Sequence, residues 1–257
     1  MARKASITGG TKKVKLKPQK SREIIRKYHV LLKKQAQLKK EGNVAGADAV
    51  TSELEKLGGL QMYQQASISG QMEARGGDSS KLLMNWLAKY SKEPAAALLE
   101  VGCLSFDNYC TRSNYFARID RLDLNSQDPR IEQIDFMKKP VPPDLYDVVS
   151  LSLVVNFVPD SGLRGEMLKR TRKFLKPEGL LFFVLPEPCI YNSRYCNEQS
   201  ISDIFNALGY RQIEYKRTRK LVYWLLKMEE RSGPYPKICK TLVNDGAKRN
   251  NFCIALS

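Results

Sequence analysis

The sequence predicts an α/β protein, in which a helical region precedes a mostly parallel, seven-stranded sheet flanked by helices. Two observations predict this class. Apolar runs of strand length alternate with helix-length intervals over residues 93–257. Before them, apolar residues recur at every third or fourth position, as in amphipathic helices. We divide the chain into a disordered basic tail (1–20), an N-terminal helical region (21–92) and an α/β domain (93–257).

The N-terminal region contains three predicted helices. Helical spacing of apolar residues indicates helices over 22–40 and 45–57, and the short connection between them makes an antiparallel hairpin. A third helix over 79–90, which begins at a pair of serines, leads into the α/β domain. The stretch 59–78 is rich in Gln, Ser and Gly, and loops of this length in compact domains are more often functional than incidental.

The α/β domain is predicted from apolar segments separated by turn signals. A closely spaced pair of late strands suggests an antiparallel edge of the sheet. Eight segments are candidates for the seven strands of the sheet: 96–101, 115–119, 131–134, 146–154, 179–185, 210–216, 221–227 and 251–256. A helix is predicted over 161–175.

Positive charge is concentrated at the start of the chain. Residues 1–40 contain fourteen Lys or Arg and the single acid Glu23, which gives them a net +13 of the chain's +16. Such a segment binds phosphates by releasing their counterions, so nucleic acid is the first candidate partner. The stretch KKVKLKP at 12–18 fits a nuclear import signal equally well, and the charge alone leaves both interpretations open.

Composition excludes several classes of protein. Hydrophobic residues make up 42% of the chain, yet no run approaches the ~20 apolar residues of a membrane span, so we expect no membrane partner. The single histidine, His29, and six cysteines without C-x-x-C spacing offer little from which to build a metal site or a Ser-His-Asp triad. We therefore expect no metal, and cysteines that stay reduced inside the cell.

The first strand of the α/β domain ends in an acid and a turn glycine, Glu100 and Gly102. An acid followed by glycine at a tight turn lets the backbone approach a cofactor closely. Leu104 replaces the second glycine that such loops usually contain, so the turn alone is a weak signal. We expect both Glu100 and Gly102 to bind the cofactor.

Acids also follow the next two predicted strands. Asp120 lies eighteen residues after Gly102, where Rossmann-type folds place an acid that binds ribose hydroxyls. Asp123 competes for this role, and we favour Asp120 because the apolar run of the strand stops against it. After the third strand, Asp135 can accept from an adenine amino group while the ring of Phe136 packs on the base.

The loop after the first strand discriminates between two cofactors of this architecture. A dinucleotide needs its pyrophosphate held by G-x-G-x-x-G at a helix N-terminus, and residues 103–107 contain no second glycine. S-adenosylmethionine carries no phosphate and makes no such demand, so the loop favours the methyl donor. A P-loop lysine is also absent, which argues against a nucleoside triphosphatase.

The order of these motifs resembles class I, Rossmann-like methyltransferases: LLEVGCL, RID, QIDF, YDVVSLSLVVNFVP and FLKPEGLLFFVLP. Two more specific blocks are GGLQMYQQASISGQMEARGGDSSKLL at 58–83 and LPEPCIYNSRY at 185–195. Both resemble the fungal large-subunit (25S) ribosomal RNA adenine-N1 methyltransferases, and the resemblance covers nearly everything from Arg22 to Ser257.

This resemblance implies methylation of adenine N1 in large-subunit ribosomal RNA or the pre-ribosome, with Gly102 and Asp120 binding S-adenosylmethionine. It also implies a protein of the nucleus and nucleolus, and we expect a monomer. A related animal branch is similar in the same blocks but is understood as an S-adenosylmethionine sensor, which makes a ligand-gated binding protein the alternative. The net charge of +13 in residues 1–40 favours the RNA enzyme, because a sensor that binds protein partners has no evident need of such a basic segment.

Adenine N1 chemistry limits what the protein must supply. The N1 lone pair can attack a methyl sulfonium without prior loss of a proton, so alignment is the main requirement, and Cys189 is a less favoured candidate nucleophile. After the fourth strand, Asn156 and Phe157 keep one amide and one ring of the N/D-P-P-Y/F turn but lack its double proline, which disfavours N6 chemistry. Ser152 either faces the methionine end of the cofactor or packs against a helix.

The block after the fifth strand supplies the other candidates for contact with the acceptor base. Asn192 and Arg194 can read a base edge or hold phosphate, and Tyr191 or Tyr195 can stack on an extruded base. The basic run 216–220 either extends an RNA surface or forms a solvated hairpin.

Overall fold

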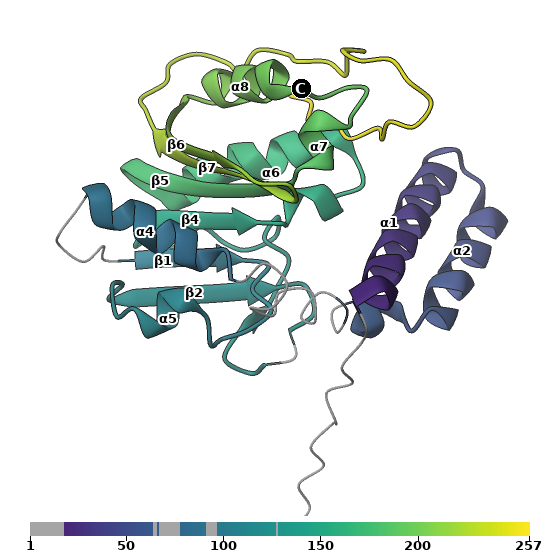
Figure 1. The fold of residues 1–257 in the computed structure, drawn as a ribbon, viewed down its shortest axis with the longest axis horizontal. Helices are drawn as coiled ribbons and strands as arrows, with labels where there is room; N and C mark the ends of the chain where they lie inside the picture. Colours follow the sequence, from purple (N-terminus) through teal and green to yellow (C-terminus); the bar gives the residue numbers. More distant parts are fainter. Residues whose placement is uncertain (1–17, 64–65, 67–77, 91–96, 127) are drawn as a thin grey trace, which may run out of the picture.

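The computed structural model describes residues 18–63, 66, 78–90, 97–126 and 128–257. A seven-stranded sheet carries helices on both faces, and a helical hairpin lies at the carboxyl ends of its parallel strands (Figure 1). The predicted fold class is confirmed. Of the predicted tail, only residues 18–20 are described, and they belong to the first helix; the predicted domain boundary at residues 92 and 93 lies outside the described residues.

The N-terminal hairpin consists of α1 (Pro18–Lys40) and α2 (Val44–Lys56). Proline suits the first turn of α1, where its missing N–H has no intrahelical partner. Asn43 begins α2 by accepting a hydrogen bond from the backbone N–H of Gly46 at 2.9 Å. The predicted hairpin is confirmed, and its two helices bury the apolar residues Tyr28, Leu31, Val50 and Leu54 together with Tyr63.

The sheet has the strand order β3-β2-β1-β4-β5-β7-β6, and β7 is antiparallel to both of its neighbours. The antiparallel edge that the sequence suggested is thus confirmed. All five residues of β1 are buried, as expected of a central strand covered on both faces. The strands are β1 (Ala97–Val101), β2 (Arg118–Asp123), β3 (Glu132–Gln133), β4 (Tyr146–Ser152), β5 (Leu175–Pro186), β6 (Tyr210–Arg217) and β7 (Leu221–Met228).

Helices cover the sheet in two layers. Alternate residues of the central strands point to opposite faces, so Leu98, Val148 and Phe182 pack under α4, whereas their neighbours pack under α6 and α8. The helices of the domain are α4 (Ser80–Tyr90), α5 (Tyr109–Arg112), the short 3-10 helix η2 (Val155–Phe157), α6 (Ser161–Phe174), α7 (Pro188–Tyr191) and α8 (Glu198–Ala207).

Several sequence predictions were wrong. The second strand begins and ends later than predicted, because its charged residues at 118, 120, 121 and 123 interrupt the apolar pattern without interrupting the strand. The segment 251–256 stays outside the sheet and makes one bridge, between Leu256 and Ile238. Its apolar residues instead pack over α6, where Arg164 donates a hydrogen bond to the carbonyl oxygen of Cys253 at 2.5 Å. Helices α7 and α8 were not predicted.

Candidate functional site

Gly102 forms the turn at the carboxyl end of β1. Its φ of +71° is a left-handed conformation that favours glycine, and its N–H donates to the carbonyl oxygen of Leu122 at 2.8 Å. A Cβ atom at this position would lie 2.6 Å from Cγ2 of Val154, in the loop after β4. The turn after β1 and the loop after β4 therefore approach each other as closely as a hydrogen side chain permits.

Glu100 is buried beside this turn, where other side chains hold its carboxylate. The Nδ2 atom of Asn108 donates to its two oxygens at 2.8 and 2.9 Å, and Nε of Arg121 lies 2.9 Å away. Burial raises the pKa of Glu100, while Asn108 and Arg121 act against that rise. The carboxylate thus braces the loop from Gly102 to Asn108, and its direct contact with a cofactor stays a prediction.

Asp120 and Asp123 occupy different parts of β2. Asp120 pairs in register with Leu99, inside the sheet, and its carboxylate accepts a hydrogen bond from the hydroxyl of Tyr146 at 2.7 Å. Burial and this contact raise the pKa of Tyr146. Asp123 ends the strand next to Gly102, and its carboxylate accepts from the N–H of Asn125 at 2.8 Å. The reason for favouring Asp120 was therefore wrong, because the strand continues for three more residues.

Asp135 and Phe136 follow β3, and their hydrogen bonds and ring contacts are with the protein itself. Phe136 is only 2% exposed, and its ring centroid lies 5.0 Å from that of Phe174 within the core. Asp135 accepts from the N–H of Met137 at 2.9 Å and so shapes the turn after the strand. Phe136 would have to leave the core to pack on a bound base, so its predicted role would require a rearrangement here.

The loop after β4 combines backbone strain with an unpaired polar atom. Leu153 adopts a φ of +59°, an outlier for a residue with a branched side chain, and such strain is concentrated at functional sites. Within the described residues, the Oδ1 atom of Asn156 is buried without a hydrogen-bond partner. An unsatisfied buried acceptor is costly, so this position suits a donor on a ligand.

A segment from Asp78 to Ser80 ties the start of α4 to this edge of the sheet. Asp78 accepts from the N–H of Tyr109 at 2.6 Å, at the start of α5, and Ser79 Oγ lies 2.8 Å from Ser152 Oγ. Ser152 thus meets another hydroxyl at the tip of β4. Sequence reasoning missed Asp78, although it ends the stretch 59–78, which stands out for its length and composition.

Asn192 and Arg194 contact the C-terminal segment. The backbone carbonyl of Asn192 accepts from the N–H of Asn250 at 2.8 Å, and Nε of Arg194 donates to the carbonyl oxygen of Gly246 at 3.2 Å. These hydrogen bonds hold the segment in place beyond β5. They join neither residue to Asn156 or to the turn at Gly102.

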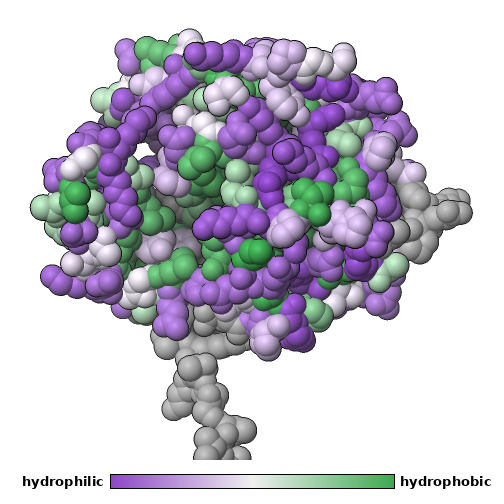
Figure 2. Space-filling view, turned by 180° about the vertical axis from the view of Figure 1, so that it is seen from behind, coloured by the Kyte–Doolittle hydropathy of each residue, from purple (hydrophilic) through white to green (hydrophobic). Residues whose placement is uncertain are grey.

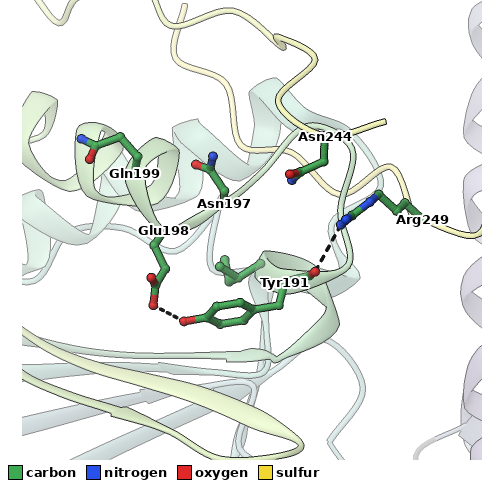
Figure 3. A pocket seen from close by; sticks show the side chains of 7 residues that line it. Tyr191, Asn197, Glu198, Gln199, Asn244 and Arg249 are labelled. Atoms are coloured by element: carbon green, nitrogen blue, oxygen red, sulfur yellow. Dashed lines mark hydrogen bonds between the residues drawn. The ribbon is translucent and has the colours of Figure 1, made fainter. Parts of the chain in front are cut away.

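Two surface pockets are lined in part by residues of the block after β5, and neither lining includes Gly102 or Asn156. One, of about 420 Å³, is lined by polar side chains that include Asn197, Glu198 and Arg249 (Figure 3). The hydroxyl of Tyr191 donates to Glu198, and Arg217 lies 3.3 Å above the tyrosine ring. These contacts occupy both the hydroxyl and one face of Tyr191, so its ring offers at most its other face to a base.

The described residues contain no group of three or more His, Cys, Asp or Glu side chains arranged to hold a metal, and none of their helices has the length and apolarity of a membrane span. All six cysteines are free thiols. Burial raises the pKa of Cys189 to about 12, so the thiol stays protonated at neutral pH. This environment agrees with the low rank of Cys189 as a candidate nucleophile.

Comparison with known proteins identifies relatives of this chain. Residues 48–254 match the family described as 25S rRNA (adenine(2142)-N(1))-methyltransferase, Bmt2. The 25S rRNA (adenine(2142)-N(1))-methyltransferase of Saccharomyces cerevisiae is 37% identical over 239 residues, which span 90% of this chain and 71% of the relative. The 25S rRNA adenine-N(1) methyltransferase of Schizosaccharomyces pombe is 39% identical over 251 residues, which span 91% of each chain.

Solved structures share the fold. An S-adenosylmethionine-dependent methyltransferase from Clostridium acetobutylicum superimposes with a TM-score of 0.51 at 11% sequence identity. The match covers 64% of this chain and 98% of the bacterial one. At this identity the likeness establishes the sheet architecture alone.

Proposed function

The chain belongs to the family of 25S rRNA adenine-N1 methyltransferases, and we propose from this that it transfers a methyl group from S-adenosylmethionine to N1 of an adenine in large-subunit ribosomal RNA. The observation that carries the proposal is the match over residues 48–254, which includes the whole sheet domain. The relatives are named as enzymes, and nothing in the comparisons supports the sensor alternative.

The residues at the carboxyl edge of β1, β2 and β4 fit S-adenosylmethionine. Gly102 lets the turn after β1 lie against Val154, where a Cβ atom would clash, and no phosphate needs to be held there. We assign the ribose hydroxyls to the carboxylate of Asp123, at the tip of β2, rather than to Asp120. Ser152 and its partner Ser79 close the tip of β4. When bound, the cofactor supplies a methyl group on a positively charged sulfur.

Asn156 is the residue that we assign to the acceptor base. Its buried Oδ1 can accept from the exocyclic amino group of adenine, which leaves the neighbouring N1 lone pair free. With the base held by Asn156, the N1 lone pair would face the methyl group that bound S-adenosylmethionine would supply, and the sulfur would keep the electron pair of the broken C–S bond. The methylated base would carry the positive charge, so no residue would have to remove a proton.

Glu100 acts indirectly in this proposal. Its contacts with Asn108 and Arg121 fix the loop that follows Gly102. Leu104 replaces the second glycine that such cofactor loops usually contain, and these side-chain contacts stabilise the loop instead. A buried carboxylate with its partners in place holds backbone geometry well, because breaking one contact leaves an uncompensated charge.

We further propose that the protein acts as a monomer on the pre-ribosome in the nucleolus, where its substrate RNA is made. The basic residues 1–40 support both contact with RNA and import into the nucleus, and the two roles are compatible.

The experiment that tests the proposal identifies the methylated atom. Large-subunit RNA transcribed without modifications is incubated with the protein and S-adenosylmethionine, digested to nucleosides and separated beside N1- and N6-methyladenosine standards. We expect N1-methyladenosine at one position. N6-methyladenosine, or a methylated base other than adenine, would contradict the assignment of Asn156 and of the reaction.

A further inference from the structure

One face of α1 has no assigned role. Its buried face carries Ile24, Tyr28 and Leu31, and meets α2 and Tyr63. The opposite face consists of four exposed residues at helical spacing, Arg26, Val30, Lys33 and Gln37. This set is called the inner face of α1 below, because α1 lies between α2 and the sheet domain (Figure 1).

The inner face looks across a hollow towards the domain. Figure 2 shows this hollow between the helical hairpin and the body of the protein. Val30 remains 57% exposed although a domain lies opposite, so the two surfaces do not pack together here. Lys33 is also exposed, yet desolvation, followed by repulsion from Arg164 of α6, lowers its pKa. Protein therefore surrounds a lysine that water still reaches.

The hairpin is joined to the loop that carries Asn156. Tyr28 of α1 stacks on Tyr63 with a centroid distance of 4.8 Å, and Tyr63 meets the edge of Phe157 at 5.2 Å. Phe157 directly follows Asn156 in η2. This row of three rings fixes the distance between α1 and the loop that we assign to the acceptor base.

We propose that the inner face of α1 is one wall of an RNA groove whose other wall is the domain edge around η2 and α7, and that a single-stranded segment carrying the target adenine occupies it. This inference rests on the proposed function. Adenine N1 lies on the Watson–Crick edge, so the base must be unpaired when it is methylated. A groove beside Asn156 is where the flanking nucleotides of such a base would lie.

Charge supports RNA as the occupant. Helix α1 contains many Lys and Arg residues and one acid, Glu23. Within the described part of the chain, Lys27 pairs with Glu53 of α2, whereas Arg26 and Lys33 form no ion pair. Unpaired cations that face a concave surface bind phosphates with release of counterions. The inner face has one exposed apolar residue, Val30, which is too little for an apolar protein partner.

The test compares two double variants with the same change in charge. Arg26→Gln with Lys33→Gln removes the two cations of the inner face. Lys34→Gln with Lys39→Gln is the control on the same helix, with both residues exposed and turned about 100° or more from Lys33. Unmodified large-subunit RNA is the probe, and its Kd is measured from about 0.05 to about 0.3 M salt, with S-adenosylmethionine affinity and thermal unfolding measured alongside.

We expect the inner-face variant to raise the RNA Kd roughly tenfold at about 0.15 M salt. The slope of log K against log salt should flatten by about 1.4, because each of the two single-strand phosphates that are no longer neutralised contributes about 0.7. The control should change the Kd less than about twofold, and both variants should keep cofactor affinity. Equal losses in the two variants, or a loss of cofactor affinity with unchanged RNA binding, would overturn the groove. Wild-type protein that binds this RNA without methylating it would count against the proposed function instead.

Discussion

Gly102 and Val154 are in such close contact that the turn after β1 has no space for a side chain: a Cβ atom at Gly102 would lie 2.6 Å from Val154 Cγ2. Val154 lies between the strained Leu153 and Asn156, so this contact couples the cofactor turn to the loop assigned to the acceptor base. Because glycine avoids this clash, the turn keeps its close approach to the loop after β4, although Leu104 replaces the second glycine usual in such loops.

We expect Gly102→Ala to weaken S-adenosylmethionine binding by roughly tenfold or more, because about 1–2 kcal/mol of left-handed strain favours a displaced turn. Gly102→Arg should abolish measurable binding while the fold is retained. Gly233→Ala is the matched control, since Gly233 also has a positive φ of +81° but has nothing within 4 Å of an added Cβ. Calorimetric titration measures affinity, and equal affinity in all three variants would show that the cofactor lies elsewhere.

The two acids of β2 should behave differently. Asp123→Asn is expected to lower cofactor affinity by about 10- to 100-fold, because hydrogen bonds to a charged acceptor contribute about 1.5–3 kcal/mol. Asp120→Asn should leave affinity unchanged and lower the free energy of unfolding by less than about 1 kcal/mol, since its contact with Arg118 is half exposed. The reverse pattern in titration and urea unfolding would restore Asp120 as the ribose ligand.

Asn156→Ala should lower kcat by about 100-fold, because a base displaced by about 1 Å no longer aligns with the methyl group. Cofactor affinity should stay within about twofold of the wild-type value. Asn192→Ala is the comparison, and we expect it to leave kcat nearly unchanged, since the backbone of Asn192 is bonded to the C-terminal segment. Steady-state kinetics on unmodified RNA distinguishes the two; a full rate in Asn156→Ala would remove this residue from the site.

The sequence indicated the fold more reliably than the site. The central strand β1 is an apolar run apart from Glu100, and the long helix α1 has apolar residues at helical spacing, so both elements followed directly from the pattern. The end of β2 could not be predicted in this way. Arg121 is buried there by its pairing with Glu100, a long-range contact that local hydrophobicity does not encode. Phe136 has an aromatic ring of the kind that stacks on bases, and its sequence position does not show that the ring packs against Phe174 instead.

Cys189 provides a prediction about pH. Its raised pKa, about 12 because of burial, means that the thiolate form is scarce between about pH 7 and 9 and increases only at higher pH. Iodoacetamide at about pH 8 should therefore modify the exposed Cys239 well before Cys189, as peptide mass mapping would reveal. Cys189→Ser should retain most of the methyltransferase activity, and a loss of transfer with an intact fold would point to a covalent role.

Removal of the basic segment 1–17, which leaves α1 whole, should weaken RNA binding without affecting the cofactor. The segment contains six Lys or Arg and no acid, and the salt slope should flatten by about 0.7 for every phosphate that these residues neutralise in the full chain. An unchanged slope, combined with loss of nuclear accumulation in cells, would assign the segment to import alone.

The central claim is tested most directly by transfer of a labelled methyl group from S-adenosylmethionine to unmodified large-subunit RNA, with wild-type protein and Gly102→Arg measured in parallel. We predict that wild-type protein places one methyl group on N1 of one adenine per RNA molecule, and that the variant places none. Wild-type protein that binds the cofactor with measurable affinity yet transfers no label, under conditions where it also binds the RNA, would contradict the account.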